Sequence, residues 1–164
     1  VLDLSQPSAV SEVTVEPGPD AKTMVLSLAL RPVTAAEAAS RSGKVVRRFT
    51  VRMVGRWEGN QGVLDEDFSF SDGERQRRVW RLTDLGQGRY SGRADDVVGE
   101  AVGQAAGNAL NWRYTLALPV DGRIWHVQFD DWMLLMDERV LLNKAVMSKF
   151  GITLGEVTLA FFKK

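Results

Sequence analysis

The chain has 164 residues with 21 basic and 21 acidic side chains, a length that suits one domain with a single core. Because the formal net charge is zero, no bulk field draws in nucleic acid, an anionic membrane or an acidic substrate, and such binding would have to be local. The lack of cysteine excludes disulfides, cysteine metal sites and thiol catalysis, and no apolar run approaches the roughly 20 residues of a membrane-spanning helix.

Residues 1–42 are predicted to form an N-terminal leader with one or two strands and a short helix. A short strand is expected at Glu12 to Glu16, and the apolar run from Lys22 to Leu30 suits a buried strand that Pro32 stops. Thr34-Ala35-Ala36-Glu37 has the spacing of a capping box, which predicts a helix of one or two turns. We expect no other helix.

Residues 43–164 consist of strand-length segments separated by short turns, which is typical of an antiparallel up-and-down meander. A meander of roughly eight strands must hide its two edges, commonly by closing into a barrel that holds one small ligand. We therefore expect a single all-β domain whose meander closes into a lipocalin-like or calycin-like barrel. The predicted turns lie at Gly59 to Gly62, Asp72-Gly73, Gly86 to Gly88, Gly107-Asn108, Asp121-Gly122, Asp137-Glu138 and Phe150-Gly151.

Alternation of apolar and polar residues assigns the two faces of the meander strands. It sends Glu66, Arg78 and Asp96, from the second, third and fourth of these strands, to the inner face. A carboxylate inside a barrel is costly unless it is paired, and Arg78 could serve both acids with bidentate geometry. The three residues either form the polar floor of a ligand pocket or make a structural ion cluster. We predict no catalytic residue.

Small side chains, among them Gly92 and Gly103, lie on the two strands before the strand of Trp112 and Tyr114. Large rings can fill the space over small residues, or the space can remain as a cavity lined by tryptophan and tyrosine. Both arrangements stay open on the sequence. The ligand-binding candidates, walls and polar floor together, are Glu66, Arg78, Trp80, Tyr90, Asp96, Trp112 and Tyr114.

Basic residues gather at the start of the meander, where the chain from Arg41 to Arg56 contains no acid. The outward arginines of this strand lie beside Asp65 and Asp67 of the next strand. Opposite charges on neighbouring strands are routine cross-strand pairs, whereas a nucleic-acid site needs basic residues that stand unneutralised on one surface. The sequence therefore predicts surface ion pairs and no nucleic-acid partner.

Two Asp-Asp pairs, Asp95-Asp96 and Asp130-Asp131, raise the question of a metal site. Consecutive strand residues point to opposite faces, so each pair offers only one side chain to one site, and no metal-loop spacing is present. We predict no metal and no cofactor. From Arg123 to Met136 the alternation weakens, and a β-bulge near Asp130-Asp131 would explain the loss of phase.

Longer motifs are spread over Gly43 to Phe162, and they read GRWEGNQGVLDEDFSFSDGE, RVWRLT, GRYSGRADDVVGEAVGQAAGNALNWRYTLALPVDG, FDDWMLLMDE and NKAVMSKFGITLGEVTLAF. Together they resemble a family of bacterial envelope lipoproteins, the domain of unknown function 3833. The resemblance implies an envelope location and a lipocalin-like barrel, with which the Gly55-Arg56-Trp57 element of lipocalins agrees. It implies no catalytic residue. The recurrent positions are Glu66, Asp72, Gly73, Trp80, Tyr90, Asp96, Asn108, Trp112, Asp130, Asp131, Trp132, Asn143, Lys149 and Gly151.

These observations favour a module that binds a small apolar or amphipathic, lipid-like molecule on the periplasmic side of the bacterial cell envelope. The chain begins at Val1 and not at Met, so we expect a segment removed upstream, and the resemblance implies membrane association through a lipid anchor that this chain does not carry. One alternative is a solid barrel that binds a partner protein through a patch from Trp132 to Leu134. Another is an acid–base enzyme that uses Glu66 or Asp96.

Overall fold

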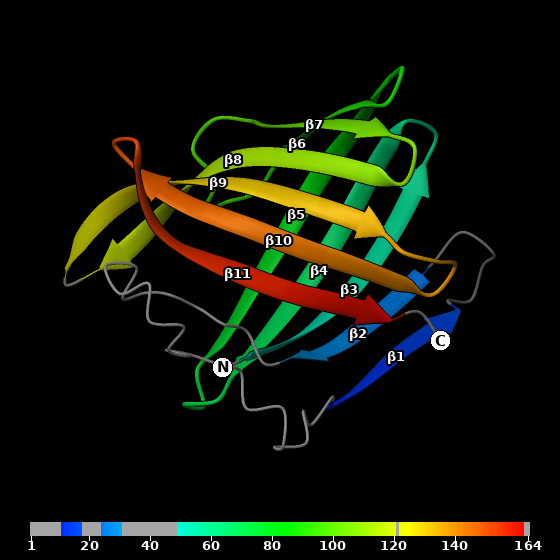
Figure 1. The fold of residues 1–164 in the computed structure, drawn as a ribbon, viewed down its shortest axis with the longest axis horizontal. Coiled ribbons are helices and arrows are strands. Elements are labelled where there is room, and N and C mark those ends of the chain that lie inside the picture. Colours follow the sequence, from blue (N-terminus) through cyan, green and yellow to red (C-terminus); the bar gives the residue numbers. More distant parts are fainter. Residues whose placement is uncertain (1–10, 18–23, 31–48, 121, 163–164) are drawn as a thin grey trace, which may run out of the picture.

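The structure, a computed structural model, describes residues 11–17, 24–30, 49–120 and 122–162 (Figure 1). Within these ranges we find no helix of the length and hydropathy that crossing a membrane requires. The helix predicted at Thr34 lies outside the described residues. The strands are β1 (Ser11–Pro17), β2 (Met24–Leu30), β3 (Phe49–Glu58), β4 (Gln61–Phe70), β5 (Arg75–Gly86), β6 (Arg89–Arg93), β7 (Ala101–Ala106), β8 (Ala109–Val120), β9 (Arg123–Leu135), β10 (Val140–Lys149) and β11 (Ile152–Phe162).

All described strands belong to one antiparallel sheet, in which each strand pairs with the next strand along the chain. The predicted all-β meander is therefore confirmed. The sheet curls until β11 lies beside β2 and β1, and in Figure 1 strands β8 to β11 cross in front of β3 to β5. The pairing found among the described residues does not join β1 to β11. The result is a curled half-barrel, which is consistent with the barrel expected from the sequence.

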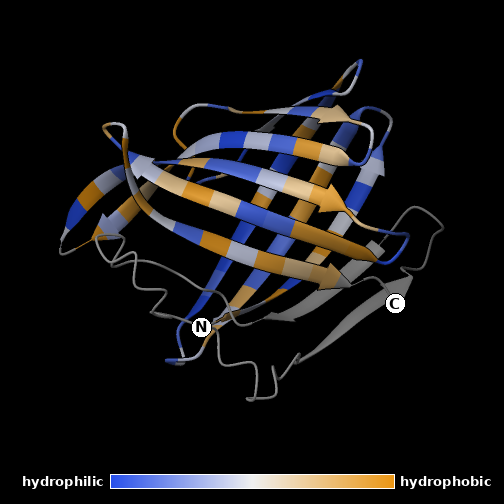
Figure 2. Cartoon of the chain, in the orientation of Figure 1, coloured by the Kyte–Doolittle hydropathy of each residue, from blue (hydrophilic) through white to orange (hydrophobic). Residues whose placement is uncertain are grey.

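The concave side of this half-barrel holds two apolar clusters. Hydrophilic and hydrophobic bands alternate along the strands in Figure 2, as expected for strands with one wet face. The phenylalanine cluster joins β3 and β4 to β10 and β11, and consists of Val51 and Phe161 with Phe49, Met53, Phe68, Leu141 and Leu159. The tryptophan cluster joins β4 to β9, and consists of Trp80, Ala94, Ala101 and Trp112 with Leu64, Leu82, Tyr90, Val97, Tyr114 and Met133.

Two local predictions are wrong. Strand β9 pairs with β8 and with β10 without a register shift, so no bulge lies at Asp130-Asp131. The inward series from Val127 to Met133 keeps its alternation, and the pattern looked broken because one inward residue, Asp131, is a carboxylate. Strand β6 ends at Arg93, so Asp96 lies in the loop that follows and not on a strand.

On the outer face, charged residues pair across neighbouring strands. The Nε atom of Arg77 donates to Oδ1 of Asp65 at 2.8 Å, and a second guanidinium nitrogen contacts Oδ2. This hydrogen bond is the main cause that lowers the pKa of Asp65, and the charges of Arg56 and Arg52 add to it. The predicted cross-strand ion pair is therefore found between β5 and β4, and Arg52 of β3 lies opposite Asp67 in the register.

Trp112 fills the space over the small residues of the neighbouring strands. A Cβ atom built on Gly92 would lie 2.7 Å from Cζ2 of Trp112, and one on Gly103 would lie 2.7 Å from Cζ3 of the same ring. Real Cβ atoms do not approach so closely, so both positions require glycine. Of the two arrangements left open by the sequence, interdigitation is the one found at Trp112.

Replacing Gly92 with alanine should destabilise the fold, because the added methyl group would collide with Trp112 and with Leu82 Cδ2 at 2.9 Å. We expect Gly92→Ala to lower the free energy of unfolding by about 1–3 kcal/mol in urea titrations. Gly55→Ala is the matched control, because a Cβ there meets Leu64 at an ordinary 3.7 Å. Equal stability of the two variants would contradict the packing described for Trp112.

Candidate functional site

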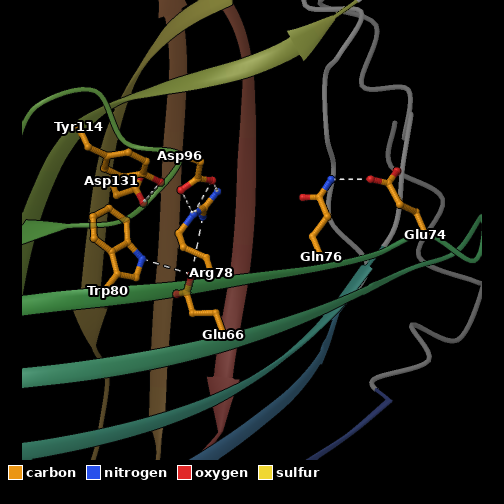
Figure 3. Close-up of polar contacts among 8 residues, drawn as sticks. All are labelled: Glu66, Glu74, Gln76, Arg78, Trp80, Asp96, Tyr114 and Asp131. Atoms are coloured by element: carbon orange, nitrogen blue, oxygen red, sulfur yellow. Dashed lines mark hydrogen bonds and ion pairs between the residues drawn. The ribbon is translucent and has the colours of Figure 1, made fainter. Parts of the chain in front are cut away.

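Five residues with polar groups meet on the concave side, between the two apolar clusters. They are Glu66 of β4, Arg78 of β5, Asp96 of the loop after β6, Tyr114 of β8 and Asp131 of β9, and we call them the polar cluster (Figure 3). The strand members each occupy an inward position of their strand's alternation. The sheet's curl brings together residues that are far apart in sequence. The pair Glu74 and Gln76, also drawn in Figure 3, lies apart from the polar cluster.

Arg78 is the cation of the polar cluster. Its Nε atom donates to Oδ1 and Oδ2 of Asp96 at 3.0 and 2.9 Å, and Nη2 donates to Oδ2 at 2.7 Å. Its Nη1 atom lies 3.7 Å from Oε2 of Glu66. The guanidinium carbon is 5.6 Å from the ring centre of Phe68 and 6.0 Å from that of Trp80. One side chain therefore pairs with two acids and packs against both apolar clusters, as the sequence predicted for the two acids.

Glu66 is buried, with 8% of its surface exposed. The indole Nε1 of Trp80 donates to Glu66 Oε2 at 3.3 Å. Burial raises the pKa of Glu66 to about 7, although the charge of Arg78 and the hydrogen bond from Trp80 oppose this rise. Near neutral pH this carboxyl group can therefore either hold a proton or release it.

Asp131 is the member of the polar cluster that the set of sequence candidates lacked. The hydroxyl of Tyr114 donates to its Oδ2 at 3.2 Å, whereas its Oδ1 is buried and has no hydrogen-bond partner among the described residues. Burial raises the pKa of Asp131 to about 7, and the charge of Glu66 acts in the same direction. Burial, followed by the charge of Asp131, also raises the pKa of Tyr114.

Asp130 points away from its neighbour, as expected for consecutive strand residues. Its Oδ1 accepts a hydrogen bond from Nδ2 of Asn111 at 2.5 Å, while Asp131 faces the concave side. Within the described residues no group of three potential metal ligands comes together. The side chains of the two aspartates thus lie on opposite faces of the sheet. Strict alternation from Val127 onward was the signal that could have identified Asp131 as an inward acid.

The polar cluster reaches solvent at Asp96, whose side chain is 39% exposed. The other predicted site residues divide into two groups. Trp80 contacts the polar cluster directly and lies edge-on to Tyr114, with ring centres 5.3 Å apart. Trp112 and Tyr90 belong to the tryptophan cluster, and Tyr90 lies edge-on to Trp57 at 6.3 Å. Five of the seven predicted residues therefore lie in or against the polar cluster, namely Glu66, Arg78, Trp80, Asp96 and Tyr114. Trp112 packs edge-on against Trp80, with ring centres 5.6 Å apart.

A hollow of about 310 Å³ lies on the outer side of β8 and β9. Four of its lining residues, Arg113, Thr115, Gln128 and Asp130, alternate with the inward residues of these strands. The hollow is shallow and open to solvent, and of the polar cluster only Tyr114 borders it. It adjoins the concave side through Tyr114 and Phe129, two inward residues that also border it.

Comparison with known proteins agrees with the family resemblance. A family model described as "Protein of unknown function (DUF3833)" matches residues 33–163. The match begins somewhat before Gly43, the point from which the sequence motifs run. Searches of curated proteins and of solved structures find no match. Because the family model covers most of the chain, the protein belongs to the DUF3833 family.

Proposed function

We propose that the concave side of the half-barrel binds a small amphipathic, lipid-like molecule whose polar end carries a hydrogen-bond donor. One observation carries the proposal: Oδ1 of Asp131 is a buried acceptor with no partner among the described residues. A buried carboxylate oxygen without a donor is unfavourable by about 1–3 kcal/mol or more. A hydroxyl or amine group of a ligand would supply that donor.

The charges of the polar cluster favour the same kind of polar end. One guanidinium pairs with two of the three carboxyl groups, and Asp96 already binds its Nε and Nη2 atoms. An anionic head group would therefore meet Glu66 and Asp131 without a free cation to offset it, whereas an ammonium group would stabilise their charged forms.

Aromatic rings beside the polar cluster suit the apolar part of such a molecule. Tyr114 stacks on Phe129 with ring centres 5.0 Å apart, and Trp80 lies edge-on to Tyr114. Rings that surround a few convergent polar groups are typical of small-molecule sites. The partly exposed Asp96 supports an approach from the loop after β6.

A second candidate, binding of a partner protein, is supported by apolar residues at the turn between β9 and β10. Trp132, Leu134, Leu135 and Met136 are exposed there. The patch differs from the one expected, because Met133 packs into the tryptophan cluster while its neighbours face outward. The third candidate, acid–base catalysis, has weaker support, because Glu66 is buried beneath Trp80 and Asp96 is held by Arg78.

The raised pKa of Glu66 makes stability depend on pH. The group holds a proton in the folded state up to about pH 7, whereas its ordinary pKa is 4.5. The bound proton stabilises the folded state fully below pH 4.5, and this stabilisation is lost as the pH rises through 7. Between these two pH values we expect the free energy of unfolding of the wild type to fall by roughly 2–3 kcal/mol relative to that of Glu66→Gln. Urea titrations across pH test this, and the exposed control Asp95→Asn should follow the wild type.

Binding of simple probes tests the proposed ligand class. Isothermal titration calorimetry with dodecylamine, dodecanol and dodecanoic acid, each below its solubility limit and below any micelle concentration, should show binding of the amine and the alcohol but not of the acid. Asp131→Asn should weaken binding of dodecylamine about tenfold. The control Asp95→Asn, on a fully exposed side chain, should leave it unchanged. Equal binding of all three probes, or none, would contradict the proposal.

We further propose that the protein works in the bacterial cell envelope, on its periplasmic side, as the family resemblance implies. Cell fractionation with immunoblotting of the natural full-length gene product tests this location. We expect the protein in the membrane fraction, released by detergent and not by salt. Recovery in the cytosolic fraction would refute both the location and the lipid anchor.

A further inference from the structure

We propose that two neighbouring hairpin tips at one end of the sheet insert into the surface of an anionic phospholipid bilayer. The tips are the β8–β9 turn and the β10–β11 turn. We call their exposed apolar residues the apolar tip, which consists of Val120, Ile124, Trp125, Phe150 and Ile152. Among them Phe150 is 87% exposed, Ile152 68% and Ile124 62%. The proposal is independent of the ligand proposed for the concave side.

The β8–β9 hairpin projects beyond the strands beside it. Its two strands stay paired as far as Val120 and Arg123, whereas β9 pairs with β10 only from Gln128 onward. In Figure 1 this hairpin runs past the turn between β10 and β11 at the left of the view. The last turn of the hairpin therefore stands clear of the rest of the sheet. Apolar side chains on such a projection lie in water unless something covers them.

Lys149 links the two tips. Its Nζ atom lies 3.9 Å from the ring centre of Trp125 on β9 and 5.2 Å from that of Phe150 in the next turn. The two turns thus form one surface, with a cation among aromatic rings. Tryptophan and lysine side chains of this kind are enriched where proteins meet the lipid headgroups.

The backbone conformation at Phe150 supports a functional role for its exposed ring. Phe150 has a φ of 52°, in the left-handed region, and is followed by Gly151 with a φ of 77°. Tight hairpin turns of this type favour asparagine, aspartate or glycine, and a bulky residue there is unfavourable. An asparagine would make the same turn with less strain. A phenylalanine that is both strained and exposed is therefore better explained by contact with another surface than by folding.

The charges around the apolar tip are complementary to an anionic membrane. Arg123 and Lys149 flank the apolar residues, and in the sequence Asp121 lies between Val120 and Gly122. Two basic side chains and one acidic one leave this stretch with a small positive charge. A local basic and aromatic surface of this kind attracts anionic headgroups although the whole chain is neutral.

The size of the apolar tip fits a membrane better than a protein partner. Its five side chains expose on the order of 500 Å². A stable protein interface buries roughly 800 Å² on each partner, and it requires a complementary face instead of two projecting turns. A bilayer has no such requirement, because each apolar side chain that enters the headgroup region contributes separately.

Vesicle sedimentation tests the proposal on the whole chain. The wild type should bind vesicles of phosphatidylglycerol and phosphatidylethanolamine, and it should bind vesicles of phosphatidylcholine more weakly. Phe150→Asn should weaken binding about tenfold or more, because it removes one large apolar group from the lipid-facing surface. Because asparagine suits the left-handed turn, this variant should unfold at no lower urea concentration than the wild type.

The matched control is Leu85→Ser, which removes an exposed apolar side chain at the β5–β6 turn, at the opposite end of the sheet. It should bind the anionic vesicles as the wild type does. Three results would overturn the proposal: no binding by the wild type, equal binding by Phe150→Asn and the wild type, or an equal loss in Leu85→Ser. A dimer in solution that Phe150→Asn abolishes, without any vesicle binding, would assign the apolar tip to a second copy of the chain instead.

Discussion

The guanidinium group of Arg78 stabilises the buried carboxyl groups on the concave side of this half-barrel. Three carboxyl groups, those of Glu66, Asp96 and Asp131, lie on or near a face that is mostly apolar. Arg78 holds one of them with charge-assisted hydrogen bonds and approaches a second. Its guanidinium carbon also lies 5.6 Å from the ring centre of Phe68 and 6.0 Å from that of Trp80, so this side chain adjoins both apolar clusters. A lysine could supply the charge but neither the fork of donors nor the flat stacking surface.

Because Arg78 carries one positive charge beside three carboxyl groups, the polar cluster has more acid than this side chain can neutralise. Glu66 and Asp131 resolve this imbalance by keeping protons to an unusually high pH. Such a cluster is costly for a purely structural core, since apolar residues of similar size would pack without the desolvation penalty. This cost is the physical reason to look for a ligand on the concave side before any other part of the molecule.

Alternation along the strands was enough to predict the meander and to place Glu66 and Arg78 together. Alternation did not predict features that depend on contacts between strands. Asp131 was attributed to a bulge because an inward carboxylate resembles a break in phase, and only the pairing of β9 with both neighbours shows that the phase is intact. The role of Gly92 was likewise open, because its need for glycine depends on Trp112, which comes from a strand that is not its neighbour along the chain. These contacts form when the sheet curls, so they cannot be predicted from the sequence of a single strand.

The strands follow one another in the sheet in the same order as along the chain, and this order affects how the protein folds. Each hairpin can form from residues close in sequence, so most of the sheet can assemble with little loop-closure entropy. The contact between Val51 and Phe161, at opposite ends of the meander, is different because it forms only when the whole sheet has curled. We therefore expect the flat meander to be the early species, and the closing of the phenylalanine cluster to be the slow step. Until that step is complete, the buried acids stay in water and give up their protons as ordinary carboxyl groups do.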